Sequence, residues 1–339
     1  MKLIPSFSKI LLDWFEENQR QLPWRGETDP YKIWASEIIL QQTRVNQGWA
    51  YYLKFIDRFP DVKSLANAPL QEVLRVWQGL GYYSRARNMR IAAQQIMQNH
   101  QGIFPHHYLE IKKLQGIGNY TAAAIGSIAF NLPYPAVDGN VLRVMTRIFG
   151  IYDDITQQKT VHQITQYCEM LIDKENPGTF NQALMELGAI QCIPKNPNCE
   201  VCPFVSQCVA FTKQQVNLLP IKSLNIKIKN RYFHYFIFIK EGKTIIEQRT
   251  ANDIWKNLYQ FPMIETEQEV SKISNITPLD KSNIANAIFL KEVKHKLTHQ
   301  HLTIRFYVVN EYFPELQNNW LVVSMKDLKK FPFPVALIL

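Results

Sequence analysis

Four of the five cysteines in this 339-residue chain lie within seventeen consecutive positions. They are Cys192, Cys199, Cys202 and Cys208, with the spacing C-x6-C-x2-C-x5-C. A disulfide scaffold is usually a short secreted chain rich in cysteine, whereas this chain is long and carries elsewhere only Cys168. The pattern therefore indicates a metal site in a reducing compartment, and Cys168 is predicted to be an ordinary buried thiol.

Four thiolates can bind either a zinc ion or a [4Fe-4S] cluster, so the ligand type leaves both open. Zinc ribbons usually have two C-x2-C pairs on separate knuckles, whereas here one pair is flanked by longer arms in a single loop. We predict a structural role for the metal. Lys195 and Lys213 lie within or just beyond the loop, so a loop pinned by metal would present positive charge to phosphates.

The composition fits a protein with a sizeable core and an anionic partner. At 339 residues and 46% hydrophobic, the chain is long enough for two domains. The net charge of +9 favours a polyanion such as nucleic acid. The longest apolar stretch, residues 120–132, is shorter than the ~20 residues that a membrane-spanning helix needs. We expect a soluble protein, and no secretion signal is visible.

The periodicity of apolar residues changes once along the chain. Residues 1–213 follow a helical period, which predicts an all-α domain. Residues 214–230 are polar and basic, as is typical of a linker. Residues 231–339 contain alternating segments such as "YFHYFIFIKEGKTIIEQR", which reads as two strands joined across Glu241 and Gly242. The predicted fold class is therefore multidomain, with an all-α domain followed by an α+β domain.

Two glycines, Gly116 and Gly118, lie between a helix predicted to end near Leu114 and one predicted to begin near Tyr120. Glycines allow a tight turn there, and they let backbone N–H groups approach a phosphate at the helix N-terminus. The alternative is a turn without a phosphate site, which would contain the same two glycines. The small residues of "TAAAIG" permit close packing of the second helix, which favours a helix-hairpin-helix.

This hairpin, followed by an aspartate after "PAV" and then by the cysteine loop, resembles the endonuclease III superfamily of DNA glycosylases. Within that superfamily, "SEIILQQTRV", "GLGYYSRARN" and "VDGNVLRV" are similar to the glycosylases that remove adenine paired with 8-oxoguanine. The resemblance covers residues of roughly 10–210. It implies base excision repair on double-stranded DNA with A:8-oxoguanine or A:G mispairs, and a [4Fe-4S] cluster on the four clustered cysteines.

Cleavage of an N-glycosidic bond suits two carboxylates, one protonated to assist base departure and one ionised to stabilise the cationic sugar. Asp138 precedes the predicted helix "GNVLRVMTRIF", whose N-terminal dipole favours the ionised form. The same position suits a plain N-cap. We predict that Asp138 stabilises the oxocarbenium ion.

Glu37 lies on a predicted helix that Asp29 would cap and Pro30 would begin. Its neighbours are bulky and apolar, so desolvation would raise its pKa and keep it protonated near neutrality. A solvated glutamate on a helix face is the alternative. The resemblance places the acid of the family at this position, before "LQQT", and we predict that Glu37 is the general acid.

Tyr120 distinguishes between the branches of the superfamily. Bifunctional members carry a lysine at this position, whose amine attacks the sugar and leads to strand scission. Because tyrosine cannot form an imine, we predict a monofunctional enzyme that leaves an abasic site. The resemblance implies that Tyr120 and Asn140 position the reaction around Asp138.

A base in a duplex must be extruded before an enzyme can reach it. The resemblance implies a group of side chains for this step: Gln42 and Tyr82 as wedges in the base stack, Thr43 on the partner strand, and Trp24, Arg25, Leu40 and Gln182 around the adenine.

The C-terminal domain is similar to the Nudix-like domain of this family, and "IIEQRTANDIWKNLYQFP" matches its strand and following loop. It lacks the R-E-x2-E-E-x-G run whose carboxylates would hold divalent ions, so we expect no hydrolysis there. The domain of the family recognises 8-oxoguanine through a Phe-Ser-His turn. Leu297, Thr298 and His299 correspond to that turn, and leucine departs from its phenylalanine. An exposed strand end without a ligand is the alternative.

Other functions stay open on the sequence. A thymine glycosylase acting on T:G mispairs would share Tyr120 and Asp138, although Gln182 and the Nudix-like domain argue against it. A noncatalytic protein that binds damaged DNA would retain the cluster, although Glu37 and Asp138 together argue against it. A Nudix hydrolase is the least supported. We expect a monomer in a bacterial-type cytoplasm, associated with the nucleoid.

Overall fold

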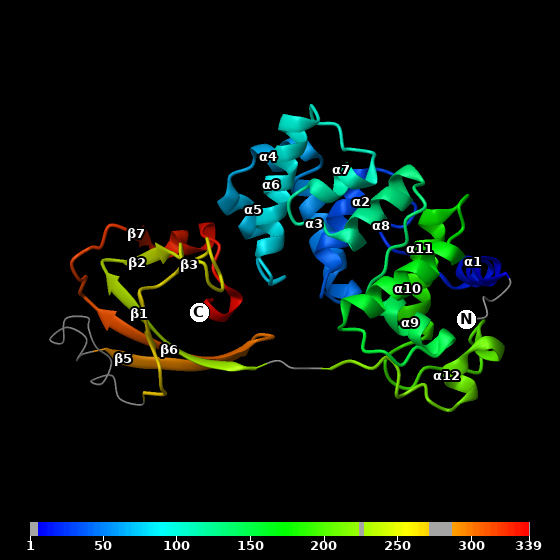
Figure 1. Ribbon diagram of the computed structural model, residues 1–339. Helices are drawn as coiled ribbons and strands as arrows, with labels where there is room; N and C mark the ends of the chain where they lie inside the picture. The colour runs from blue at the N-terminus through cyan, green and yellow to red at the C-terminus, as the bar shows by residue number, and fades with distance from the viewer. Residues whose placement is uncertain (1–5, 224–226, 271–286, 339) are drawn as a thin grey trace. The chain divides into compact units, whose positions relative to one another are not determined.

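The computed structural model describes residues 6–223, 227–270 and 287–338, and the chain divides into two compact units (Figure 1). The first unit comprises Met1–Asn67 and Asn88–Leu224. The second comprises Ala68–Arg87 and Asn225–Leu339. The boundaries predicted at residues 213 and 231 stay a prediction.

The first unit is helical throughout the residues that the structure describes. Its helix α8 is buried along most of its length and contacts α2, α7 and α11. A Cβ on Gly178 of α11 would lie only 2.8 Å from the Cα of Ile128, so α11 meets α8 at backbone distance. The elements are α1 (Phe7–Asn18), α2 (Pro30–Leu40), α3 (Val45–Arg58), α4 (Val62–Asn67), α6 (Ser84–Asn99, which begins in the second unit), α7 (Tyr108–Lys113), α8 (Asn119–Phe130), α9 (Gly139–Phe149), α10 (Gln158–Leu171), α11 (Pro177–Glu186), η1 (Leu187–Gln191), η2 (Val205–Gln207) and α12 (Val209–Thr212).

The predicted helix starts are confirmed by their caps. Asp29 Oδ1 accepts a hydrogen bond from Tyr31 N at 2.9 Å, and Pro30 is the first residue of α2. Asp138 caps α9 in the same way. Between α7 and α8, Gly116 has φ +79°, and a Cβ there would lie 2.7 Å from the Cβ of Asn88. This turn therefore requires glycine both for its conformation and for space.

The second unit contains a mixed seven-stranded sheet with the order β3-β2-β1-β6-β5, in which β4 also pairs with β1 and β7 with β2. β1 and β6 are parallel, with Phe233 opposite Ile304, and the other described pairs are antiparallel. Glu241 and Gly242 both have positive φ and join β1 to β2 in the predicted tight turn. The elements are α5 (Leu70–Val76), β1 (Lys229–Lys240), β2 (Lys243–Gln248), β3 (Tyr259–Gln260), β4 (Met263–Thr266), β5 (Ile288–Lys296), β6 (Gln300–Asn310), β7 (Trp320–Ser324), η4 (Met325–Lys330) and η5 (Val335–Leu337).

Both faces of this sheet are covered. Phe233, Tyr235 and Ile237 of β1 belong to one apolar core, while Phe236 and Phe238 belong to another. Successive side chains of β1 point to opposite faces of the sheet, so the strand contributes to the core on each face. The two units confirm the prediction of an all-α part followed by an α+β part. None of the described helices is long and apolar enough to cross a membrane.

Candidate active site

A cavity of about 570 Å³ lies among α2, α8, α9 and α11 of the first unit. It combines carboxyl, amide and guanidinium groups with apolar side chains. The predicted site residues that line it are Trp24, Arg25, Glu37, Leu40, Gln42, Thr43, Tyr120, Asp138, Asn140 and Gln182.

Glu37 projects into this cavity from the buried helix α2. The hydroxyl of Tyr120 donates a hydrogen bond to Glu37 Oε2 at 2.5 Å. Burial raises the pKa of Glu37 to about 7, and the charge of Asp138 adds to this effect, although Tyr120 and Arg25 oppose it. A substantial fraction of Glu37 is therefore protonated at neutral pH.

Asp138 lies at the same cavity as the N-cap of α9. Its Oδ1 accepts from Val141 N at 2.8 Å, and its Oδ2 accepts from Asn140 Nδ2 at 2.8 Å. Burial raises the pKa of Asp138 above its ordinary value, while these hydrogen bonds act against burial and favour the anion. Arg143 donates to Asn140 Oδ1 at 2.9 Å, which turns the amide nitrogen of Asn140 toward Asp138.

Arg25, Gln182 and Trp24 form another part of the wall. Arg25 Nη1 donates to Gln182 Oε1 at 2.5 Å, so the amide nitrogen of Gln182 remains as its donor toward a ligand. Arg25 Nε is buried and has no hydrogen-bond partner among the described residues. Trp24 meets Tyr52 edge-on, with ring centroids 5.4 Å apart. This part of the cavity therefore offers hydrogen-bond donors beside an aromatic ring.

Glu186 is a cavity residue that the sequence analysis missed. It is 3% exposed and accepts from Arg20 Nε at 2.7 Å and from Arg25 Nη2 at 3.2 Å. Burial alone would raise the pKa of Glu186, but Arg20 and Arg25 outweigh it and lower the pKa. The available signal was its spacing, since Glu186 lies four residues after Gln182 and so on the same face of α11.

The residues predicted to contact DNA outside the base pocket lie in different places. Gln42 is exposed at the cavity and has φ +56°, with Thr43 half-buried beside it. Gly116 and Gly118 do not line the cavity and form the turn before α8.

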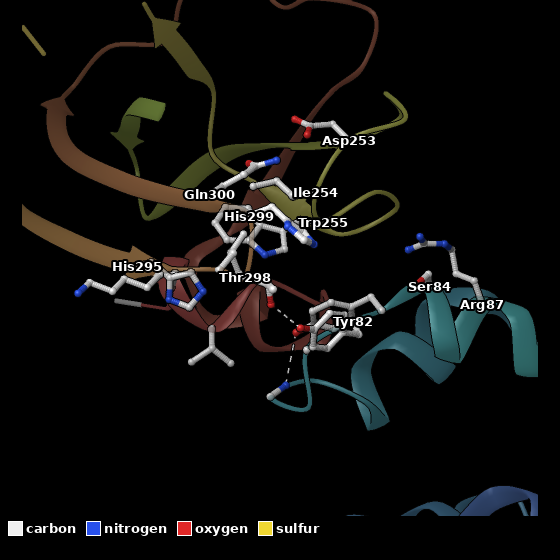
Figure 2. A pocket seen from close by; sticks show the side chains of 17 residues that line it. Tyr82, Ser84, Arg87, Asp253, Ile254, Trp255, His295, Thr298, His299 and Gln300 are labelled. Atoms are coloured by element: carbon white, nitrogen blue, oxygen red, sulfur yellow. Dashed lines mark hydrogen bonds between the residues drawn. The ribbon is translucent and has the colours of Figure 1, made fainter. Parts of the chain in front are cut away.

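A second cavity, of about 580 Å³, lies in the second unit and brings together Tyr82, Leu297, Thr298 and His299 (Figure 2). The hydroxyl groups of Tyr82 and Thr298 are 2.7 Å apart and share a hydrogen bond. The structure therefore divides the residues predicted to contact the two bases between two cavities.

The four clustered cysteines line one small cavity in the first unit, and none of them forms a disulfide. Arg147 Nη1 lies 3.4 Å from Cys192 Sγ and donates to Ile193 O at 2.8 Å, so a buried guanidinium holds the loop. Among the described residues, no group of three His, Cys, Asp or Glu is placed to hold a single metal ion. Cys168 is buried, as predicted.

Comparisons with known families place two matches on this chain. Residues 35–170 match the family described as "HhH-GPD superfamily base excision DNA repair protein". Residues 234–337 match the NUDIX domain family. The matches coincide with the helical part and with the mixed sheet, and they confirm the predicted Nudix-like fold of the C-terminal part.

Proteins named "Adenine DNA glycosylase" match between two thirds and nearly all of this chain. The protein of Buchnera aphidicola subsp. Schizaphis graminum (strain Sg) is 36% identical over 98% of this chain and 97% of its own length. The Arabidopsis thaliana protein is 32% identical over 95% of this chain and 54% of its own length. The human protein is 38% identical over 66% of this chain and 42% of its own length.

Solved structures resemble the helical part. A thermostable thymine-DNA glycosylase is 28% identical, with a TM-score of 0.57 over 61% of this chain and 95% of its own. A trapped endonuclease III–DNA covalent intermediate is 22% identical, with a TM-score of 0.53 over 61% of this chain and 94% of its own. The second likeness concerns the fold alone.

Proposed function

The chain belongs to the adenine DNA glycosylases of the HhH-GPD superfamily of base excision repair, and from that premise we propose that it excises adenine paired with 8-oxoguanine. One observation carries the catalytic assignment. Glu37 and Asp138 line a single cavity, where burial raises the pKa of Glu37 to about 7, while Asp138 accepts hydrogen bonds from Val141 N and Asn140 Nδ2 that favour its anion. Such a difference between two carboxyls is what an acid and an anion in one site require.

Glu37 is the general acid in this proposal. Tyr120 donates to Oε2, which leaves Oε1 to carry the proton that a ring nitrogen of adenine receives. The C1′–N9 bond then breaks with its electron pair moving to the base, and the proton from Glu37 neutralises the developing negative charge.

Asp138 stabilises the oxocarbenium ion left on the sugar. Its hydrogen bonds from Val141 N and Asn140 favour the carboxylate form and fix its direction. A water molecule adds its hydroxide to C1′ and returns a proton to Glu37, which completes an abasic site. No lysine lines the described part of the cavity, so a Schiff base with the sugar has no amine there.

Adenine would be held by side chains that line this cavity. The amide nitrogen of Gln182 can donate to an acceptor on the edge of the base, because its oxygen already accepts from Arg25 Nη1, and the ion pair of Arg25 with Glu186 holds this arrangement. Trp24 and Leu40 supply the apolar walls. Gln42 and Thr43 at the cavity are proposed to contact the opened duplex.

Cys192, Cys199, Cys202 and Cys208 would hold a [4Fe-4S] cluster. They line one cavity, and a cubane needs its thiolates on four separate irons rather than converging on one ion. When bound, the cluster would cross-link the loop that carries Lys195 and Lys213, and its role here is structural.

The purified chain is expected to be brown, with broad visible charge-transfer absorption. Iron and sulfide analysis should return close to four of each per chain, because each cysteine ligates one iron. Changing Cys199 to serine should remove most of the colour, whereas changing Cys168 to serine should not. A colourless protein that contains one zinc would contradict the proposal.

In the second unit, Thr298 and its neighbours Leu297 and His299 are proposed to recognise 8-oxoguanine, with Tyr82 inserted in the stack beside them. Thr298 is exposed at a cavity of about 580 Å³, and its hydroxyl can donate or accept. A monomeric state and a location at the nucleoid of a bacterial-type cytoplasm stay predictions.

The substrate assignment is tested with labelled duplexes that carry A opposite 8-oxoguanine, G or C, and T opposite G. After alkali treatment, strand breaks at the abasic site should form fastest from A:8-oxoguanine, more slowly from A:G, and not at T:G. The expected order follows from an adenine pocket in one unit and a lesion contact in the other.

The same reactions treated with borohydride test the absence of an imine. Little trapped protein–DNA adduct is expected, because Tyr120 replaces the lysine of bifunctional relatives. Cleavage confined to T:G would overturn the choice of base, and abundant trapped adduct would overturn the monofunctional mechanism.

A further inference from the structure

Two aromatic residues of the described chain have backbones in the left-handed region, Tyr82 with φ +45° and Trp255 with φ +60°. Both line the cavity of the second unit. A bulky side chain in this region is strained, and it persists only where the surroundings over-determine it. Residues with strained backbones are concentrated at functional sites. The contacts that hold Trp255 in this conformation can therefore indicate its function.

The segment 253–257, which we call the Trp255 loop, is held by side chains that bind its carbonyl groups. Arg249 Nε donates to Ile254 O at 3.0 Å, and Gln248 Nε2 donates to Asn257 O at 3.1 Å. Leu258 N, directly after the loop, donates to Trp255 O at 3.0 Å. These bonds fix the direction in which Trp255 projects.

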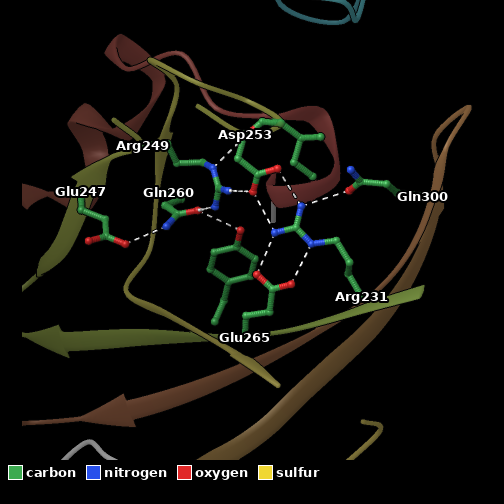
Figure 3. Close-up of polar contacts among 9 residues, drawn as sticks. Arg231, Glu247, Arg249, Asp253, Gln260, Glu265 and Gln300 are labelled. Atoms are coloured by element: carbon green, nitrogen blue, oxygen red, sulfur yellow. Dashed lines mark hydrogen bonds and ion pairs between the residues drawn. The ribbon is translucent and has the colours of Figure 1, made fainter. Parts of the chain in front are cut away.

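An ion-pair network centred on the buried Arg231 links this loop to the turn that carries Thr298 (Figure 3). Arg231 is 7% exposed and binds both oxygens of Asp253, at 2.8 and 2.7 Å, and both oxygens of Glu265, at 2.7 Å each. Arg231 Nη1 also donates to Gln300 Oε1 at 3.0 Å. Asp253 is the first residue of the Trp255 loop, and Gln300 directly follows the turn that carries Thr298. The guanidinium of Arg231 therefore fixes the position of the loop relative to that turn.

Trp255 itself is half-buried. Its ring centroid lies 6.2 Å from that of Phe233 and 6.0 Å from that of His295, while part of the ring faces the cavity. Leu297, on the same cavity, is aliphatic. The aromatic ring in the cavity wall near Thr298 therefore comes from Trp255, on a different segment of the chain.

We propose that Trp255 is a specificity-determining residue for the base opposite the target adenine, supplying the aromatic face that Leu297 does not. This inference rests on the proposed recognition of 8-oxoguanine by the second unit. Stacking on Trp255 fixes the plane of the base, so that the hydroxyl of Thr298 meets the N7–H and O8 edge that distinguishes 8-oxoguanine from guanine. Arg231 is the positioning residue that keeps Trp255 and Thr298 in a fixed position relative to each other.

The test uses the full chain and compares second-order rate constants for adenine release from A:8-oxoguanine and A:G duplexes. In Trp255→Ala the ratio of the two constants is expected to fall about tenfold, the loss typical of removing one base–aromatic stack. Trp255→Phe should keep most of the ratio. Phe289→Ala removes an exposed aromatic ring outside this cavity and should leave the ratio at the wild-type value.

Trp255→Leu keeps a large apolar side chain but removes the aromatic ring. The ratio of the two rate constants should fall in this variant as it does in Trp255→Ala. The leucine variant therefore provides the test if the alanine variant folds poorly. If the ratio of the two rate constants in Trp255→Leu stays at the wild-type value, whether or not both constants fall, the proposal is wrong. A wild-type chain without preference for 8-oxoguanine would instead refute the proposed lesion recognition. The two failures are therefore distinguishable.

Discussion

The Glu37→Gln variant is expected to release adenine about 10³-fold more slowly than the wild-type chain, within the range that a positioned general acid contributes. The glutamine oxygen can still accept the hydrogen bond from Tyr120, so the geometry is kept while the acidic proton is lost. Single-turnover release of adenine from an A:8-oxoguanine duplex measures the loss.

Binding separates this effect from a structural one. The affinity of Glu37→Gln for a duplex with a non-cleavable adenine analogue should remain within a few-fold of wild type. Glu110→Gln is a matched control, because Glu110 is only half-buried, pairs with Lys113 and lies outside the cavity. A near-normal rate in Glu37→Gln would refute the assignment of the acid.

The pH profile gives an independent reading of Glu37. Because its pKa is raised to about 7 and the protonated form is the working one, the single-turnover rate should be highest below that pH. It should then fall as the pH rises through about 7. The residual activity of Glu37→Gln should lack this decline.

The Asp138→Asn variant is expected to lower the rate of adenine release by about 10²- to 10³-fold, as the loss of a pre-organised charge does in other enzymes. Asparagine can still accept from Val141 N as the N-cap of α9, although its amide nitrogen cannot accept from Asn140 Nδ2, so the variant should stay folded with a modest fall in melting temperature. The measurement is single-turnover release together with thermal unfolding of the same preparation.

Asp29→Asn is the control for this variant. Asp29 caps α2 in the same unit, as Asp138 caps α9, but Asp29 does not line the cavity. Its substitution should leave the rate near the wild-type value. If both variants lose activity alike, the effect of Asp138 would belong to capping, and its role as an anion in the reaction would be wrong.

Several parts of this protein could be predicted because their causes are local. Asp29 and Asp138 start helices because a short side-chain oxygen reaches the N–H groups of the next turn. Glu241 and Gly242 form a hairpin turn because both adopt positive φ. The cysteine spacing and the change from a period of 3.6 to one of 2 likewise depend on neighbours in the sequence.

The rest depends on partners far apart in the sequence. The spacing of Glu186 from Gln182 places it on the cavity face of α11, but its ion pairs with Arg20 and Arg25, more than 160 positions earlier, could not be predicted. The assignment of Ala68–Arg87 to the second unit is likewise a matter of long-range contacts. The sequence analysis does not single out Trp255, which is distinguished by its strained backbone and its place on a cavity.

The sequence alone determined where helices begin, where the chain turns, which cysteines belong together and which residue types can do the chemistry, because steric limits and short hydrogen bonds act within a few residues. The tertiary structure decided the protonation of Glu37, since desolvation depends on the atoms that α8, α9 and α11 bring around it. It also decided that Trp255 and Thr298 share one cavity, because the buried guanidinium of Arg231 ties two distant segments together.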